Sequence, residues 1–340
     1  MEDRLAAWDF ALPDALVART PVTPRRASRL LVMPRDGRAL AHHAFVDLPD
    51  RLSPGDVLVA NDTRVMAARL FARRLTGGKV ELLVLGIGDG TVEALARPAK
   101  KLSPRDVLSV GEHTVEVIGH RGEGIVTIRP SVDIALLMAQ HGEIPLPPYL
   151  GRRAEPADAD RYQTVFAGPL GAAAAPTAGL HFDETVLRAL ATRGVEVATV
   201  TLHVGLGTFR PLRDEDLDRG ALHEEAYVVP EATVQTLAAA RARGNRVVAI
   251  GTTSARTLES ATPEGASVPV PGAGTTDLFV RPPYTFRAID GMITNFHLPR
   301  SSLLMIVAAM VTRERLLDAY AEAIEAGYRF YSYGDAMLLL

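Results

Sequence analysis

The sequence contains no cysteine among its 340 residues. This absence excludes disulfide bonds, thiolate zinc sites, iron–sulfur clusters and a cysteine nucleophile. Lysine is scarce as well: Lys79, Lys100 and Lys101 are the only three, so 37 − 3 = 34 basic residues are arginines. The net charge is −3, so the chain lacks the global positive charge of many nucleic-acid-binding proteins. A contact with nucleic acid would need a local patch of arginines, which bind phosphate in a bidentate manner.

Several sequence signals of whole protein classes are also missing. The longest apolar run, 303–311, is too short to span a bilayer, and residues 1–10 lack the apolar core of a signal peptide. We therefore expect a cytoplasmic protein that makes no membrane contact. We also expect a monomer. There is no Gly-X-Ser-X-Gly elbow, no P-loop lysine and no dinucleotide glycine fingerprint, which argues against a serine hydrolase and a nucleotide-binding methyltransferase.

The pattern of predicted elements changes twice along the chain. Strands and helices alternate before residue 64 and after residue 150, which is typical of an α/β domain. Between these parts, short strands at hairpin spacing predict a small antiparallel barrel, with strands at 67–73, 79–85, 91–96, 106–110, 113–118 and 124–128. The sequence therefore predicts an α/β fold in which a discontinuous α/β domain, 1–64 and 150–340, carries an inserted antiparallel β-barrel domain, 65–149.

Polar residues follow three of the predicted strands of the α/β domain. Residues 61–64, which include Arg64, follow a strand at 57–60; residues 203–209 follow one at 195–202; residues 251–259 follow one at 246–250. The carboxyl ends of strands in an open α/β sheet commonly line a ligand crevice. We therefore expect the functional site along these strand ends.

Four histidines, His181, His203, His223 and His297, lie beside predicted strand or helix ends. Most of the other five are expected at the surface. No pair of the four has the close spacing of metal ligands, so we expect no metal site. His181 precedes a predicted helix capped by Asp183, a position that favours an anion. On this segment alone, a loop histidine with a satisfied hydrogen bond is the simpler interpretation.

Two further segments suit substrate binding. The small residues at 251–254 offer backbone N–H groups to a phosphate, carboxylate or ribose. Arg256 and Glu259 lie one turn later on the predicted helix, where they would otherwise form a weak surface ion pair. His223, Glu224 and Glu225 are either a base–acid pair in a loop or a solvated acidic turn.

An ordered set of motifs runs over nearly the whole length of the chain. The motifs are LLV at 30–32, NDTR at 61–64, GGKVELL at 77–83, RPAK at 97–100, PLPPY at 145–149, DRYQTVFA at 160–167, APTAGLHF at 175–182, TLHVGLGTF at 201–209, GTTSARTLE at 251–259, TNFHLP at 294–299 and YRFYSYGD at 328–335. Taken together, they resemble the S-adenosylmethionine:tRNA ribosyltransferase-isomerase family of queuosine biosynthesis.

The resemblance implies a reaction and its substrates. Members transfer the ribosyl part of S-adenosylmethionine to 7-aminomethyl-7-deazaguanine at the wobble position of a tRNA. The product is epoxyqueuosine, and adenine and methionine leave. S-adenosylmethionine is then a co-substrate, and no cofactor is expected. The family fold is likewise an α/β domain interrupted by an antiparallel barrel.

This chemistry can be matched to residues. A base must remove a ribose proton beside the sulfonium, and His203, His181 and Glu225 are candidates, with His223 nearby. His297 or Asp277 would donate to the departing adenine. Gly251, Thr252, Thr253 and Arg256 suit the methionyl carboxylate, and the motif residues Arg64, Thr177, Glu259 and Asn295 are further substrate-binding candidates. Phe209, Phe296 or Tyr162 would stack on a flipped anticodon base.

The chain departs from the family pattern at three places. Glu224 replaces a usual Ser in His-Ser-Glu, Pro283 replaces a Gly, and Ser302 replaces a Thr. The first change adds a carboxylate near the expected site. It leaves open a non-catalytic tRNA-binding relative as the alternative to an active enzyme.

Overall fold

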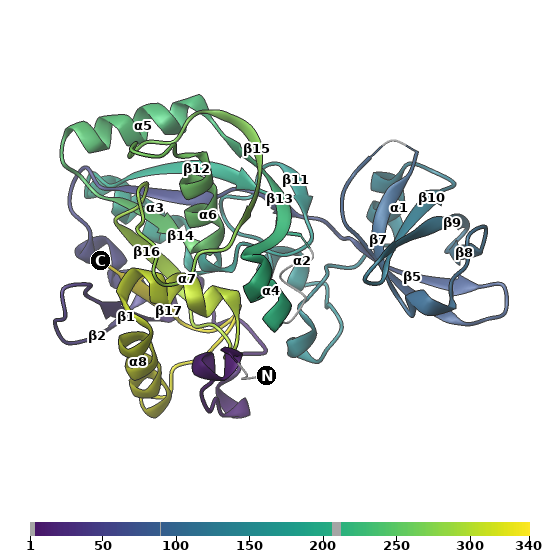
Figure 1. Ribbon diagram of the computed structural model, residues 1–340, viewed down its shortest axis with the longest axis horizontal. Helices are drawn as coiled ribbons and strands as arrows, with labels where there is room; N and C mark the ends of the chain where they lie inside the picture. The colour runs from purple at the N-terminus through teal and green to yellow at the C-terminus, as the bar shows by residue number, and fades with distance from the viewer. Residues whose placement is uncertain (1–3, 89, 206–211) are drawn as a thin grey trace.

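The computed structural model describes residues 4–88, 90–205 and 212–340. It has two parts, a large sheet covered by helices and a small closed barrel set to one side of it (Figure 1). Phe209, one of the stacking candidates, lies outside the described residues. Among the helices that are described, none is both long and apolar enough to cross a membrane.

The large sheet has nine strands in the order β15-β13-β12-β3-β14-β16-β17-β1-β2. Their bounds are β1 Arg29–Met33, β2 Ala41–Ala44, β3 Val57–Asn61, β12 Glu196–Leu202, β13 Ala221–Val229, β14 Val247–Ile250, β15 Gly272–Leu278, β16 Gly291–Asn295 and β17 Ala336–Leu339. Four neighbours, β12, β3, β14 and β16, are mutually parallel. They form the centre of the sheet, and their carboxyl ends lie at one edge.

Successive residues of the central strands pack into two different cores, as strand alternation requires. Val57 and Val59 point to the core that contains residues of α5, α6, α7 and α8. Leu58 and Ala60 point to the opposite core, which contains residues of α3. The helix bounds are α2 Asp158–Arg161, α3 Glu184–Thr192, α4 Asp214–Arg219, α5 Glu231–Ala242, α6 Gly251–Ala261, α7 Ser302–Val311 and α8 Arg313–Glu325. The α/β part is thus a sheet between two helical layers.

The barrel confirms the predicted insertion of antiparallel strands. It closes in the order β10-β7-β6-β5-β8-β9, with β5 Arg69–Arg74, β6 Lys79–Val84, β7 Val92–Arg97, β8 Val107–Val110, β9 His113–Gly122 and β10 Ile125–Pro130. Helix α1, Ile134–His141, buries Ile134, Leu137 and Met138 in the barrel core. A short parallel pair, β4 Arg64–Val65 and β11 Leu170–Ala172, joins the chain on either side of the barrel.

Two segments differ from what their local sequence predicts. The segment 272–274 contains two glycines, a composition typical of a flexible loop, but it lies within β15 and pairs with β13. A Cβ at Gly274 would lie 2.7 Å from the Tyr227 ring, so the glycine is needed where an aromatic side chain covers the strand. Residues 5–20 have apolar residues spaced as in a short helix, but the segment forms two 3₁₀ turns, Arg4–Trp8 and Asp14–Leu16.

Candidate functional site

The predicted site residues gather because the four central strands are parallel. His203 follows β12, residues 61–64 end β3, helix α6 starts directly after β14, and His297 follows β16. We call this line of strand ends the carboxyl edge. In open α/β sheets such an edge, beyond the ends of parallel strands, is where ligands bind.

His203 is fixed at one ring nitrogen and open at the other. Its Nδ1 lies 2.8 Å from the Thr63 hydroxyl, and its ring packs on Gly171, where a Cβ would lie 2.6 Å from the ring. Among the described residues, its Nε2 has no hydrogen-bond partner. Desolvation in this half-buried position lowers the pKa of His203. The imidazole is therefore neutral at pH 7, and Nε2 can accept a proton when Nδ1 carries the ring proton.

Glu225 and Arg256 form a buried ion pair at this edge. Their side chains are only 7% and 9% exposed, and the Arg256 guanidinium donates directly to the Glu225 carboxylate. The backbone N–H of Gly205, just after His203, donates to the other carboxylate oxygen at 2.9 Å. The pair therefore links β13, α6 and the segment that follows β12.

This pairing corrects two expectations. His223, Glu224 and Glu225 lie within β13 rather than in a loop, and Glu224 is exposed while Glu225 is buried. Arg256 pairs with Glu225 and not with Glu259. Glu259 is fully buried and accepts hydrogen bonds from the backbone N–H groups of Arg287 and Ala288 and from the Tyr284 hydroxyl. Its oxygens anchor that loop instead of facing the carboxyl edge.

The start of α6 carries buried donors without partners. Among the described residues, Arg256 Nη2 and Thr253 Oγ1 are buried and make no hydrogen bond. The two residues are three apart on α6 and so share a face. Gly251 begins the helix with a φ of +87°, and Ile250 before it provides no side-chain cap. Unpaired buried donors are costly. Here they belong to the first two turns of a helix, and a helix N-terminus favours an anion.

His181 belongs to a closed polar network. Ser28 donates to the Arg25 carbonyl and accepts from His181 Nδ1 at 2.8 Å, while Asn295 donates to Nε2 at 3.1 Å. Thr177 donates to the Asn295 side-chain oxygen. Burial lowers the pKa of His181 to about 3. Both ring nitrogens are therefore occupied in a neutral ring, which fits the satisfied loop histidine and not a proton acceptor.

The other candidates are divided between this edge and its surroundings. His297 is 8% exposed, its Nε2 lies 2.7 Å from the Thr294 hydroxyl, and burial lowers the pKa of its ring to about 3. Arg64 is exposed and donates to the Ala167 carbonyl. His223 is half-buried on β13. Asp277 is exposed, and strand alternation turns it away from Thr276, which bonds to Ser260 on α6.

Two of the three stacking candidates for a flipped base, Tyr162 and Phe296, are buried. Tyr162 and Phe296 are 1% and 0% exposed. Phe296 packs among Tyr320, Tyr328 and Phe330, so both predictions are wrong. Gly171 was not predicted as a site residue, although it makes the space for His203. It carries no local signal in the sequence, because the contact depends on β11 lying against the end of β12.

Comparisons with known proteins identify the family of the chain. The family model described as "Queuosine biosynthesis protein" matches residues 5–339. A protein of Anaeromyxobacter dehalogenans, named S-adenosylmethionine:tRNA ribosyltransferase-isomerase, is 51% identical over 99% of each chain. A protein of the same name from Moorella thermoacetica is 49% identical over 99% of this chain and 100% of its own length.

A solved structure is similar over almost the whole chain. The crystal structure of the S-adenosylmethionine tRNA ribosyltransferase of Thermotoga maritima has 34% sequence identity and a TM-score of 0.57. The similarity covers 98% of this chain and 100% of the other. From the family match and these full-length relatives, we conclude that the chain belongs to the queuosine biosynthesis protein family.

Proposed function

We propose that the protein is an S-adenosylmethionine:tRNA ribosyltransferase-isomerase. It transfers and isomerises the ribosyl group of S-adenosylmethionine onto 7-aminomethyl-7-deazaguanine at the wobble position of a tRNA. The products are epoxyqueuosine-tRNA, adenine and methionine. S-adenosylmethionine is a co-substrate here, and no cofactor takes part in the reaction.

The observation that carries the proposal is the set of buried, unpartnered donors beside a neutral histidine at the carboxyl edge. Arg256 Nη2, Thr253 Oγ1 and the uncapped start of α6 offer positive charge and hydrogen-bond donors to one anion. The methionyl carboxylate of S-adenosylmethionine has this chemistry. Gly251 and Thr252 complete the first turn, and the arginine–carboxylate bond is of the strong, charge-assisted kind.

His203 is the base that this geometry supports best. It is neutral, its Nε2 is open among the described residues, and Thr63 holds the other nitrogen. Of the other two candidates, His181 has both nitrogens occupied and Glu225 is paired with Arg256. We therefore assign removal of the ribose proton beside the sulfonium to His203, and to Glu225 the positioning of Arg256.

His297 is better placed than Asp277 to assist the departure of adenine. His297 lies at the carboxyl edge, whereas Asp277 is exposed and faces away from α6. If the Thr294 hydroxyl donates to Nε2, the ring proton sits on Nδ1 and can be donated to the purine. His297 acts in this scheme as a neutral donor.

Binding of tRNA, a polyanion, must be explained for a chain with a net charge of −3. Phosphate contacts must come from a local group of arginines, so binding should weaken steeply as salt is added. The residue Glu224, which replaces the usual serine, does not argue for an inactive relative, because it is exposed and Glu225 keeps the buried contacts.

The test is adenine release from S-adenosylmethionine, measured with tRNA that carries 7-aminomethyl-7-deazaguanine and with tRNA that carries guanine. We expect release only with the first tRNA. His203→Ala should abolish it, and Glu224→Ser, a change on an exposed position, should leave it unchanged. If His203→Ala released adenine at the wild-type rate, His203 would not be the base. If the wild-type protein released no adenine with either tRNA, the proposed function would be wrong.

A further inference from the structure

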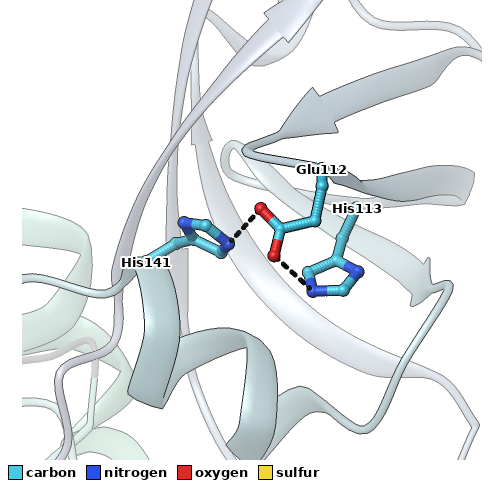
Figure 2. A group of neighbouring side chains, drawn as sticks. All are labelled: Glu112, His113 and His141. Carbon is cyan, nitrogen blue, oxygen red and sulfur yellow. Dashed lines mark ion pairs between the residues drawn. The ribbon is translucent and has the colours of Figure 1, made fainter.

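A group of three ligating side chains lies on the barrel, apart from the carboxyl edge. Glu112, His113 and His141 each offer one ligand atom, and these atoms all lie within 4.8 Å of one another. Glu112 Oε1 is 3.6 Å from His113 Nε2, and Glu112 Oε2 is 3.5 Å from His141 Nε2. Figure 2 shows the carboxylate between the two imidazoles.

The barrel brings these residues together from two elements. Glu112 and His113 belong to the hairpin of β8 and β9, with Gly111 and Glu112 as its two-residue turn. His141 ends α1, whose buried face fixes it against the barrel. Gly111 has a φ of +57°, and a Cβ there would lie 2.2 Å from the His141 ring. The glycine therefore makes the turn and also gives the imidazole its place over it.

The spacing suits a tetrahedral ion. With metal–ligand bonds of about 2.1 Å, neighbouring ligand atoms of a tetrahedral zinc site are roughly 3.4 Å apart. Each of the two contacts of Glu112 is close to this distance, one through Oε1 and the other through Oε2. With one atom taken from each residue, all three lie within 4.8 Å of one another, so a small closure brings them around an ion. His141 Nε2 is buried and has no hydrogen-bond partner among the described residues, so a ligating atom is already withdrawn from water. Two histidines and one carboxylate form a ligand set that zinc uses in proteins.

We infer that Glu112, His113 and His141 bind a divalent transition-metal ion of the zinc class, which clips the β8–β9 hairpin to the end of α1. This metal site would be separate from the site of ribosyl transfer, since it lies on the barrel and not at the carboxyl edge (Figure 1). His113 Nε2 lies 2.9 Å from the Gln140 side-chain oxygen. When the ion binds, His113 Nε2 gives up its hydrogen bond to Gln140 and coordinates the ion instead. The three side chains leave the fourth coordination position of the ion to water.

The experiment is calorimetric titration of metal-free, tag-free protein with ZnCl₂, followed by thermal unfolding with and without zinc. We expect one zinc ion per chain and, in excess zinc, a rise in Tm of roughly 5 °C. His141→Ala and Glu112→Gln should lose both effects. His120→Gln, a change of another barrel histidine outside the group, should keep them. The visible bands of tetrahedral Co²⁺ provide a readout that does not depend on stability.

Three results would overturn the inference. The first is wild-type protein that binds no zinc. The second is equal binding by the wild type and by a folded His141→Ala or Glu112→Gln, checked by circular dichroism. The third is loss of binding in His120→Gln to the same extent, which would indicate nonspecific adsorption by barrel histidines.

Discussion

Gly171 is the position at which the placement of His203 can be tested without changing the histidine itself. A Cβ added at Gly171 would lie 2.6 Å from His203 Cε1 and Nδ1, whereas ordinary contact begins at 3.4 Å. To reach ordinary contact, the imidazole and the strand that carries the added Cβ must separate by about 3.4 − 2.6 = 0.8 Å. Such a shift breaks the 2.8 Å hydrogen bond to Thr63.

The expected effect of Gly171→Ala is on the chemical step. A displacement of about 1 Å in a reacting group costs on the order of 10²-fold in rate. We expect kcat for adenine release to fall by about that factor, while the KM for S-adenosylmethionine changes little, because the donors at α6 are untouched. Single-turnover release with saturating tRNA measures the step directly.

The matched control is Gly119→Ala. A Cβ at Gly119, on β9 of the barrel, meets nothing within 4 Å, so this variant should keep wild-type kinetics. If Gly171→Ala were as fast as Gly119→Ala, the reasoning would be refuted, since the reaction would then not depend on where His203 sits.

Three further predictions concern stability. Arg256→Met should lower the free energy of unfolding by about 3–5 kcal/mol, because Glu225 then stays buried without its partner; a loss below ~1 kcal/mol in a urea titration, typical of an exposed pair, would contradict the burial. The pKa values of His181 and His297 fall from 6.5 to about 3 on folding, so the unfolded chain binds more protons between these pH values. The two neutral rings therefore contribute their full share to the free energy of unfolding above pH 6.5, and this share falls by about 2 kcal/mol for each ring at pH 5. His181→Gln should make the free energy of unfolding depend less on pH. An unchanged pH dependence would count against a buried neutral ring at His181. Glu259→Ala should cost about 1–3 kcal/mol by leaving backbone donors unpaired and should leave the KM for S-adenosylmethionine unchanged; a raised KM with native stability would instead make Glu259 a substrate ligand.

Much of the fold can be predicted from the sequence because its signals are local. Turns such as 76–78 and 121–124 separate short strands, and this spacing was enough to predict the closed barrel. Asp183 caps α3 through the backbone N–H groups of Thr185 and Val186, as its position before the helix indicated. Local signals mislead at 272–274, where the glycines belong to a strand. Glycine is needed there because Tyr227 of the neighbouring strand covers Gly274, and this contact has no signal in the local sequence.

The site was harder to predict because its contacts are made across the sheet. The polar residues after the strands correctly pointed to His203 and to the start of α6. No spacing in the sequence indicated that Arg256 would form its ion pair with Glu225 on β13, because Glu259 lies one turn away on its own helix. His181 resembled a reactive histidine in the sequence. Only the structure shows that Ser28 and Asn295 occupy both its nitrogens. His113 and His141, far apart in the chain, meet through the packing of α1 on the barrel.

Nucleoside mass spectrometry of the tRNA product detects the proposed ribosyl transfer directly. Purified protein is incubated with S-adenosylmethionine and tRNA that carries 7-aminomethyl-7-deazaguanine, and the digested nucleosides are compared with a reaction lacking protein. Ribosyl transfer predicts that the deazaguanine nucleoside is converted to epoxyqueuosine, with adenine and methionine released in equal amounts. A methylated nucleoside, or an unchanged one in the presence of bound tRNA, would contradict it.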